Sequence, residues 1–200
     1  MRIDRPAAIV LSVSLALLAA CAPGEEQPPQ EQFWSSLEAL CGQAYEGELV
    51  EGNPADSAFI GRTLTMYVRE CGDDEIRIPF YAGEDRSRTW VITRTDTGLR
   101  LKHDHRHQDG TEDAVTQYGG DTQEGGTAQV QEFHADAHTA QLIPAASTNI
   151  WTVEVVPGEK YGYALRRVGT DRRFRVEFDL TNPVAPPPAP WGYEERPATH

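Results

Sequence analysis

The chain has 200 residues, and its 31 acidic residues outnumber its 18 Lys and Arg residues, which gives a net charge of −13. This length fits one domain with appendages and is too short for an α/β barrel. The hydrophobic fraction of 39% excludes a chain that is disordered throughout. The acidic balance argues against nucleic acid or an anionic membrane surface as a partner, because both attract cations.

The N-terminal segment has the composition of a secretion signal. A charged start precedes an apolar run over residues 7–18, which is shorter than the roughly 20 residues that a transmembrane helix needs. The run ends in Leu18-Ala19-Ala20-Cys21, which resembles the lipobox of bacterial lipoproteins. The resemblance implies that residues 1–20 are a signal peptide that is removed, and that Cys21 is the acylated first residue of the mature chain.

The lipobox resemblance also implies a cellular location. Ala22 follows the Cys, where Asp tends to retain lipoproteins at the inner membrane of two-membrane bacteria. We therefore expect a protein of the bacterial cell envelope, anchored by palmitate-type acyl chains at Cys21 to the outer membrane and facing the periplasm. The alternative is an ordinary signal peptide with a chance Cys. No other segment is expected to cross a membrane.

The remaining cysteines indicate a disulfide. Three Cys are present, and Cys21 leaves Cys41 and Cys71. In the oxidising compartment of an exported protein two such thiols usually pair, which contributes roughly 3–4 kcal/mol for a loop of about 30 residues. The alternative is two separate buried thiols.

A tether and one helix are predicted before the main domain. Residues 21–31 are polar and rich in Pro and Gly, which is typical of a flexible tether after the lipidated Cys. Residues 32–41 predict a short helix that ends at Gly42. Its apolar stripe consists of Phe33, Leu37, Leu40 and Cys41.

Strand patterns dominate the rest of the chain. Apolar and polar residues alternate with a period of two, which predicts about eight or nine antiparallel strands. The clearest patterns cover residues 64–68, 75–80, 90–95, 99–102, 151–155, 161–165 and 174–180. We predict a mainly β meander over residues 32–182 that forms a barrel, with a sandwich as the alternative and one short N-terminal helix.

Two resemblances accompany this layout. The helix and the Gly-rich segment from Gly42 to Gly47 before the meander are similar to the start of calycin barrels, the lipocalins and fatty-acid-binding proteins. The Gly-x-Trp signature of lipocalins is missing. The run from Gly83 through Asp121 resembles a group of uncharacterised secreted bacterial proteins, which implies export and a shared fold and transfers no catalytic residue.

Two polar segments lie outside the strand patterns. Residues 109–128 are Gly-rich and predict a long loop. Residues 183–200 form a Pro-rich tail that favours polyproline II. This tail is predicted either to be disordered or to dock through Trp191 on the barrel or on a partner.

Five of the six His lie in two clusters of alternating residues. On a strand, the first cluster shares the face of Leu99 and Leu101 and is expected to point into the barrel near one mouth. Neutral imidazole suits Zn, Cu or Ni, so both clusters are candidate ligands of a divalent transition metal or of a small molecule. The alternative is a structural or surface role. The candidate residues are His103, His105, His107, His134, Asp136 and His138.

No catalytic signature is present. The sequence has no nucleophile elbow, no phosphate-binding Gly-Lys-Ser/Thr loop and no His-Glu-x-x-His motif, so no catalytic residue is assigned. The leading hypothesis is a lipid-anchored envelope protein whose barrel binds a small ligand without catalysis. The alternatives are a metal-binding protein that uses the His-rich strand and a protein-interaction module that uses the Pro-rich tail.

Overall fold

The structure is a computed structural model that describes Met1 and residues 27–199, so the predicted signal peptide and Cys21 lie outside the described residues. The helices are α1 (Pro29–Glu38) and α2 (Ala137–Leu142), with single 3-10 turns at Pro54–Asp56 and Pro144–Ala146. The strands are β1 (Ala44–Glu51), β2 (Leu64–Tyr67), β3 (Glu70–Cys71), β4 (Glu75–Ala82), β5 (Asp85–Thr95), β6 (Gly98–His105), β7 (Tyr118–Thr122), β8 (Val130–Ala135), β9 (Asn149–Val156), β10 (Lys160–Arg167) and β11 (Arg173–Val184).

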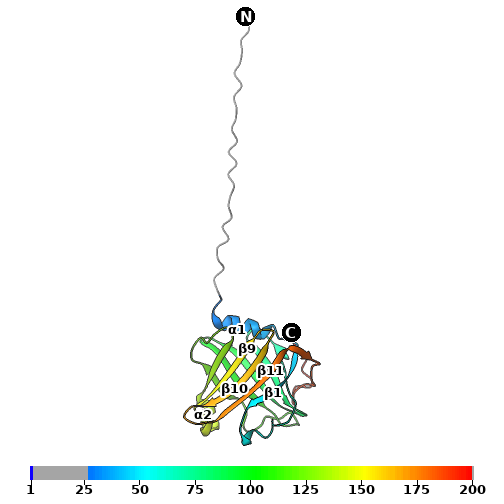
Figure 1. Ribbon diagram of the computed structural model, residues 1–200, viewed down its shortest axis with the longest axis vertical. Coiled ribbons are helices and arrows are strands. Elements are labelled where there is room, and N and C mark those ends of the chain that lie inside the picture. The colour runs from blue at the N-terminus through cyan, green and yellow to red at the C-terminus, as the bar shows by residue number, and fades with distance from the viewer. Residues whose placement is uncertain (2–26, 200) are drawn as a thin grey trace.

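The strands form a closed antiparallel barrel (Figure 1). All strands except β3 pair with their neighbours in chain order, β2 pairs with β4, and β11 pairs back onto β1. Strand β3 is an extra strand on β4. The predicted mainly β barrel is confirmed and is compatible with a calycin-like layout. The sandwich alternative is wrong, and the strands outnumber the expected eight or nine.

Strand β7 lies inside residues 109–128, where the sequence predicts only a loop. The loop prediction is wrong there because Gly119 and Gly120 have no side chains whose alternation could reveal a strand. A Cβ atom on Gly119 would lie 1.9 Å from the Leu101 carbonyl oxygen, and one on Gly120 would lie 1.6 Å from the His134 carbonyl oxygen. Glycine is therefore required for the close approach of β7 to β6 and β8.

Helix α1 closes one end of the barrel (Figure 1). It begins at Pro29 rather than at residue 32, since proline is favourable in the first turn of a helix. Phe33, Trp34 and Leu37 are buried in the same core as the strand side chains. No helix among the described residues is both long enough and apolar enough to cross a membrane.

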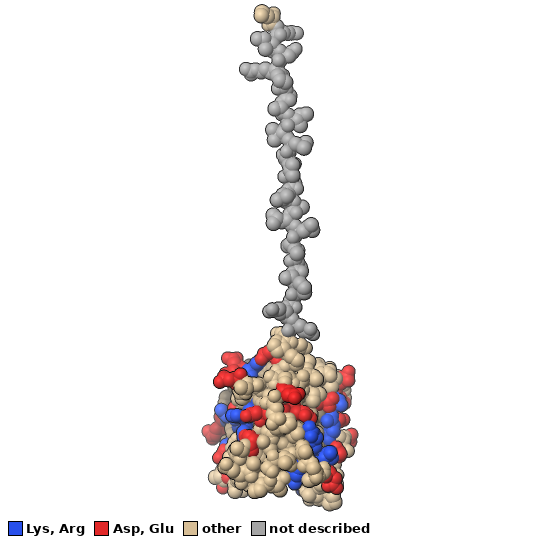
Figure 2. All heavy atoms as spheres, turned by 90° about the vertical axis from the view of Figure 1, so that its left-hand side faces the viewer, with Lys and Arg blue, Asp and Glu red and all other residues tan. Residues whose placement is uncertain are grey.

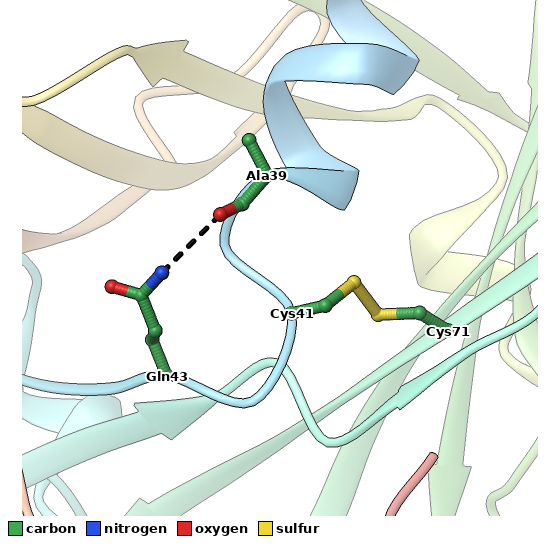
Figure 3. Close-up of a disulfide and its surroundings, with 4 residues drawn as sticks. All are labelled: Ala39, Cys41, Gln43 and Cys71. Atoms are coloured by element: carbon green, nitrogen blue, oxygen red, sulfur yellow. Dashed lines mark hydrogen bonds between the residues drawn. A yellow bond between two sulfur atoms is a disulfide. The ribbon is translucent and has the colours of Figure 1, made fainter. Parts of the chain in front are cut away.

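The predicted disulfide between Cys41 and Cys71 is present beside α1 (Figure 3). Their Cα atoms lie 6.3 Å apart, and the bridge ties the turn after α1 to β3. The Gln43 side-chain amide donates a hydrogen bond to the Ala39 carbonyl oxygen at 3.2 Å. Ala39, rather than the expected Gly42, is the C-cap of the helix.

The outer wall of the barrel is polar. Figure 2 shows acidic and basic side chains interspersed over one side of the barrel. Some of them pair across neighbouring strands, as Arg100 does with Asp121 at 2.6 Å between β6 and β7. Such exposed ion pairs contribute little stability, so the apolar interior and α1 carry most of it.

The Pro-rich tail after β11 is docked on the outer wall. The Tyr81 hydroxyl donates to the Pro188 carbonyl oxygen at 2.9 Å, and the Arg86 guanidinium donates to the Ala189 carbonyl oxygen at 3.0 Å. The Trp191 amide donates to the Arg86 carbonyl oxygen at 3.2 Å. Of the two alternatives for the tail, docking on the barrel is the one observed, and disorder is not observed for residues 185–199.

A buried carboxylate holds the end of this tail against β6. The Asp104 side chain is 1% exposed and pairs with Arg77 at 2.7 Å and with Arg106 at 3.1 Å. The Tyr193 hydroxyl donates to the same carboxylate at 2.5 Å, and its ring centre lies 5.0 Å from the Arg77 guanidinium and 4.8 Å from that of Arg106. The tail therefore supports the outer face of β6, whose inner face reaches the site described next.

Candidate functional site

A cavity of about 220 Å³ lies inside the barrel at the end opposite α1. Its wall comes from β4, β5, β6, β7, β9, β10 and β11, together with the loops at that end. Aromatic side chains are the largest group in this wall, with contributions from Phe59, Phe80, Trp90, Tyr118, Trp151, Tyr163 and Phe174. The cavity is thus a mostly apolar space inside a rigid barrel, which is the usual form of a small-molecule site.

Trp90 organises the aromatic wall. Its ring stacks on that of Phe80 with a centroid separation of 4.6 Å and an interplanar angle of 13°. It also stacks on the ring of Tyr163 at 4.4 Å and 24°. These nearly parallel rings come from three strands, and together they make this part of the cavity wall aromatic.

His103 is fully engaged within the protein. Its Nδ1 lies 3.0 Å from the Tyr118 carbonyl oxygen, and its Nε2 lies 2.6 Å from the Tyr163 hydroxyl. Because a carbonyl can only accept, Nδ1 carries the proton, and the Tyr163 hydroxyl donates to Nε2. Burial lowers the pKa of His103 from 6.5 to about 3, so the ring is neutral at physiological pH. Both ring nitrogens are therefore occupied.

His105 and Tyr118 form the adjoining part of the wall. The Tyr118 ring stacks on His103 at 4.4 Å, and its hydroxyl lies 3.2 Å from His105 Nε2. Burial, with the positive charge of Arg88 as the second cause, lowers the pKa of His105 to about 4. Burial raises the pKa of Tyr118 to about 12. At neutral pH this polar patch carries no charge of its own.

Three arginines line the mouth of the cavity. Arg172 makes a bidentate ion pair with Asp56 at 2.6 and 2.7 Å. Arg88 lies in the wall and pairs with Asp85 at 2.5 Å. The third is Arg167, the last residue of β10. The cavity thus changes from apolar in its depth to cationic at its mouth.

The structure separates the two histidine clusters. His103 and His105 both line the cavity, as the alternation along β6 predicts. His107 follows the end of β6 and is exposed. Strand β8 turns Gln131 and Phe133 inward, which leaves His134 on its outer face.

The second cluster has a local structural role. Asp136 is the N-cap of α2, where it accepts a hydrogen bond from the Thr139 amide at 2.8 Å and pairs with Lys102. His138 is exposed on α2. Within residues 27–199, no three His, Cys, Asp or Glu side chains lie close enough together to hold one metal ion. Metal binding by these residues stays a prediction from the sequence.

The sequence reading missed the arginines at the mouth, although a signal for each was present. Arg88 lies two residues from the inward Trp90, Arg167 two residues from Leu165, and Arg172 two residues from Phe174. In each strand pattern, the next inward-facing position beyond the last apolar residue holds an arginine. The histidines of β6 follow the same rule, because they continue the row of Leu99 and Leu101.

Known proteins supply no residue roles for this site. No protein-family model, no curated protein and no solved structure matches the chain. The lipobox and the envelope address stay predictions, since Cys21 lies outside the described residues. The chemistry of the cavity therefore has to come from the residues that line it.

Proposed function

We propose that this chain is a lipid-anchored envelope protein that binds a small, flat molecule in the barrel cavity without catalysis. The aromatic cavity of about 220 Å³ carries this proposal. A dry cavity of roughly 150 Å³ is enough to hold benzene. The larger space here therefore suits one aromatic ring with substituents, or two fused rings, packed against the aromatic side chains of the wall.

The protonation states of the lining groups support binding rather than catalysis. General acid–base catalysis requires a group whose pKa lies near the working pH. Burial moves His103 to about 3 and His105 to about 4, and it moves the pKa of Tyr118 to about 12. None of these three groups exchanges a proton readily near pH 7.

The position of the mouth agrees with a tethered receptor. The described body of the chain starts at Gln27, beside the α1 end, whereas the cavity opens at the other end of the barrel. Gln27 is six positions after Cys21 in the sequence, a span of at most about 21 Å. An acylated Cys21 would thus keep α1 towards the membrane and leave the mouth facing the aqueous compartment.

The anchoring part is tested by Cys21→Ser. The variant should incorporate no labelled palmitate and should keep its uncleaved signal peptide, because the residue that is acylated before cleavage is missing. A Cys41→Ser variant serves as the control, since it also removes a thiol but leaves the lipobox intact. If Cys21→Ser is cleaved and incorporates labelled palmitate to the same extent as Cys41→Ser and the unaltered chain, the proposed anchor is wrong.

The binding part is tested by blocking the cavity. Ile143 lines the mouth, and Ile143→Trp should fill part of the space and weaken binding of 2-naphthamide by more than about tenfold in calorimetric titration. Val168→Trp is the matched control, because Val168 is 53% exposed at the same end and lies outside the cavity wall. Equal binding by both variants, or no binding by the unaltered chain, would contradict the proposal.

A further inference from the structure

Arg167 differs from the other arginines at the cavity mouth. Arg172 is neutralised by Asp56 and Arg88 by Asp85. Among the residues that the structure describes, no carboxylate lies within ion-pair distance of Arg167. The cavity lining as a whole has three arginines and a single acid, in a chain whose net charge is −13.

The Arg167 guanidinium is oriented but not saturated. Its Nε donates to the Asn149 side-chain oxygen at 2.9 Å, and Asn149 is buried at the start of β9. Within residues 27–199, the two terminal amino groups of Arg167 have no hydrogen-bond acceptor. A planar guanidinium held at Nε, with two free amino groups on one side, has the donor geometry that binds a carboxylate in a bidentate manner.

The neighbourhood of this subsite is both apolar and cationic. Arg167 shares the cavity wall with Leu165 and with the aromatic side chains around Trp90. Arg88 and Arg172 in the same wall are each paired with a carboxylate, so Arg167 supplies the unpaired positive charge of the described cavity lining. An anion at the mouth is therefore favoured over a neutral group or a cation, while a flat apolar body is favoured in the depth of the cavity.

We infer that the ligand is a planar aromatic acid whose rings stack in the aromatic cavity and whose carboxylate binds the free amino groups of Arg167. This inference rests on the proposed function and adds the chemical class of the ligand. The size of the cavity selects against a long acyl chain, because a space of about 220 Å³ exceeds the benzene-sized case by only about half. The charge at the mouth selects against neutral aromatic compounds.

The test compares two compounds of nearly the same shape, 2-naphthoate and 2-naphthamide, by calorimetric titration of the full chain at neutral pH. We expect naphthoate to bind at least about tenfold more tightly than naphthamide, with a one-to-one stoichiometry. Palmitate is the third compound and should not displace naphthoate. This comparison needs no variant and does not depend on whether an altered chain folds.

Two neighbouring arginines give a matched pair of variants. Arg167→Gln should remove the preference for naphthoate while naphthamide still binds. Arg166→Gln should keep the preference, because Arg166 lies outside the cavity wall and pairs with Glu132 at 3.2 Å. Arg167→Lys should restore only part of it, since an ammonium cannot form the bidentate contact.

The outcomes separate this inference from the proposed function. Equal binding of the two naphthalene compounds, or a preference that survives Arg167→Gln, overturns the aromatic-acid inference and leaves cavity binding intact. Displacement of naphthoate by palmitate overturns the size argument and assigns the cavity to acyl chains. Failure of both naphthalene compounds to bind overturns the proposed function and the inference together.

Discussion

The two ends of this barrel differ in what occupies the interior. At one end, α1 places Phe33, Trp34 and Leu37 over the interior, and the inward rows of the strands finish in apolar residues. At the other end Ile143 and Ala146, which follow α2, line a cavity, and the inward rows of the strands finish in histidine and arginine around it. One end is therefore filled with protein atoms, and the other leaves space for a ligand.

This difference places the main source of stability at one end of the barrel and the binding site at the other. Burial of apolar surface contributes most to stability where space is filled, and an unfilled, polar mouth gives up some of that contribution. The Cys41–Cys71 disulfide is also at the filled end. We therefore expect substitutions beside α1 to change the free energy of unfolding and substitutions at the mouth to change ligand binding.

The largest expected effect is at the filled end. Phe33 is fully buried, so Phe33→Ala should lower the free energy of unfolding by about 3–5 kcal/mol. Val168→Ala at the mouth should change it by less than about 0.5 kcal/mol, since that side chain is largely exposed. Urea unfolding followed by circular dichroism measures both values. Similar losses for the two variants would show that the ends do not differ in this way.

The disulfide should have the next largest effect. It closes a loop with a sequence separation of 30 residues, so its removal by Cys41→Ser with Cys71→Ser should cost about 3–4 kcal/mol in the free energy of unfolding. Binding of 2-naphthamide by the folded fraction should stay unchanged, because the bridge is at the end away from the cavity. If the double variant lost affinity for 2-naphthamide but kept its stability, the disulfide end could not be the end that provides stability and not binding.

The pH dependence of stability sharpens the description of the mouth. The pKa of His103 falls from 6.5 to about 3 on folding, so only the unfolded chain takes up a proton between these values. Stability is therefore complete above pH 6.5 and declines as the pH falls, by on the order of 2 kcal/mol at pH 5 from this residue. Urea unfolding at pH 7 and pH 5 measures the decline.

Two histidine variants identify the source of that decline. His103→Gln should remove about half of the decline that the buried histidines cause, because the pKa of His105 is also lowered, to about 4, and the exposed His107→Gln should leave the decline unchanged. A His103 imidazole resonance that titrates near pH 6.5 in the folded chain would contradict the buried, neutral state. The same experiment would then place a titrating group inside the cavity.

The smallest effect concerns the tail that supports β6 from outside. Tyr193→Phe removes the hydrogen bond that the hydroxyl donates to Asp104 and the one that it accepts from Arg77 at 2.7 Å, and it should lower the free energy of unfolding by about 1–2 kcal/mol. Amide hydrogen exchange should become faster in residues 106–117, which the tail contacts through Arg106 and Gly110. Unchanged exchange in that loop would show that the tail does not stabilise the cavity wall.

The sequence predicted what depends on local alternation. The strand rows, the disulfide and the inward position of His103 and His105 all follow from a period of two or from the cysteine count. Strand β7 was not predicted, because Gly119 and Gly120 have no side chains and therefore show no alternation of apolar and polar residues. It also extended the inward row to His107, although β6 ends at His105.

The mouth was harder to predict because it depends on contacts between distant segments. Arg172 and Asp56 are separated by 116 residues, and nothing in either local pattern indicates that they pair. Arg167 has the same local pattern as a surface arginine, and only the closed barrel shows that it shares a wall with Trp90. The apolar end was easier, since apolar alternation indicates burial wherever the strand lies.

The four tryptophans offer the most direct test of the difference between the two ends. Trp90 and Trp151 line the cavity, Trp34 lies in α1, and Trp191 lies in the docked tail. The indole N–H signals in a two-dimensional NMR spectrum are followed while 2-naphthoate is added. We predict saturable shifts for Trp90 and Trp151, with Trp34 and Trp191 unchanged. Shifts confined to Trp34 or Trp191, or no saturable shift, would contradict a binding site at the open end of the barrel.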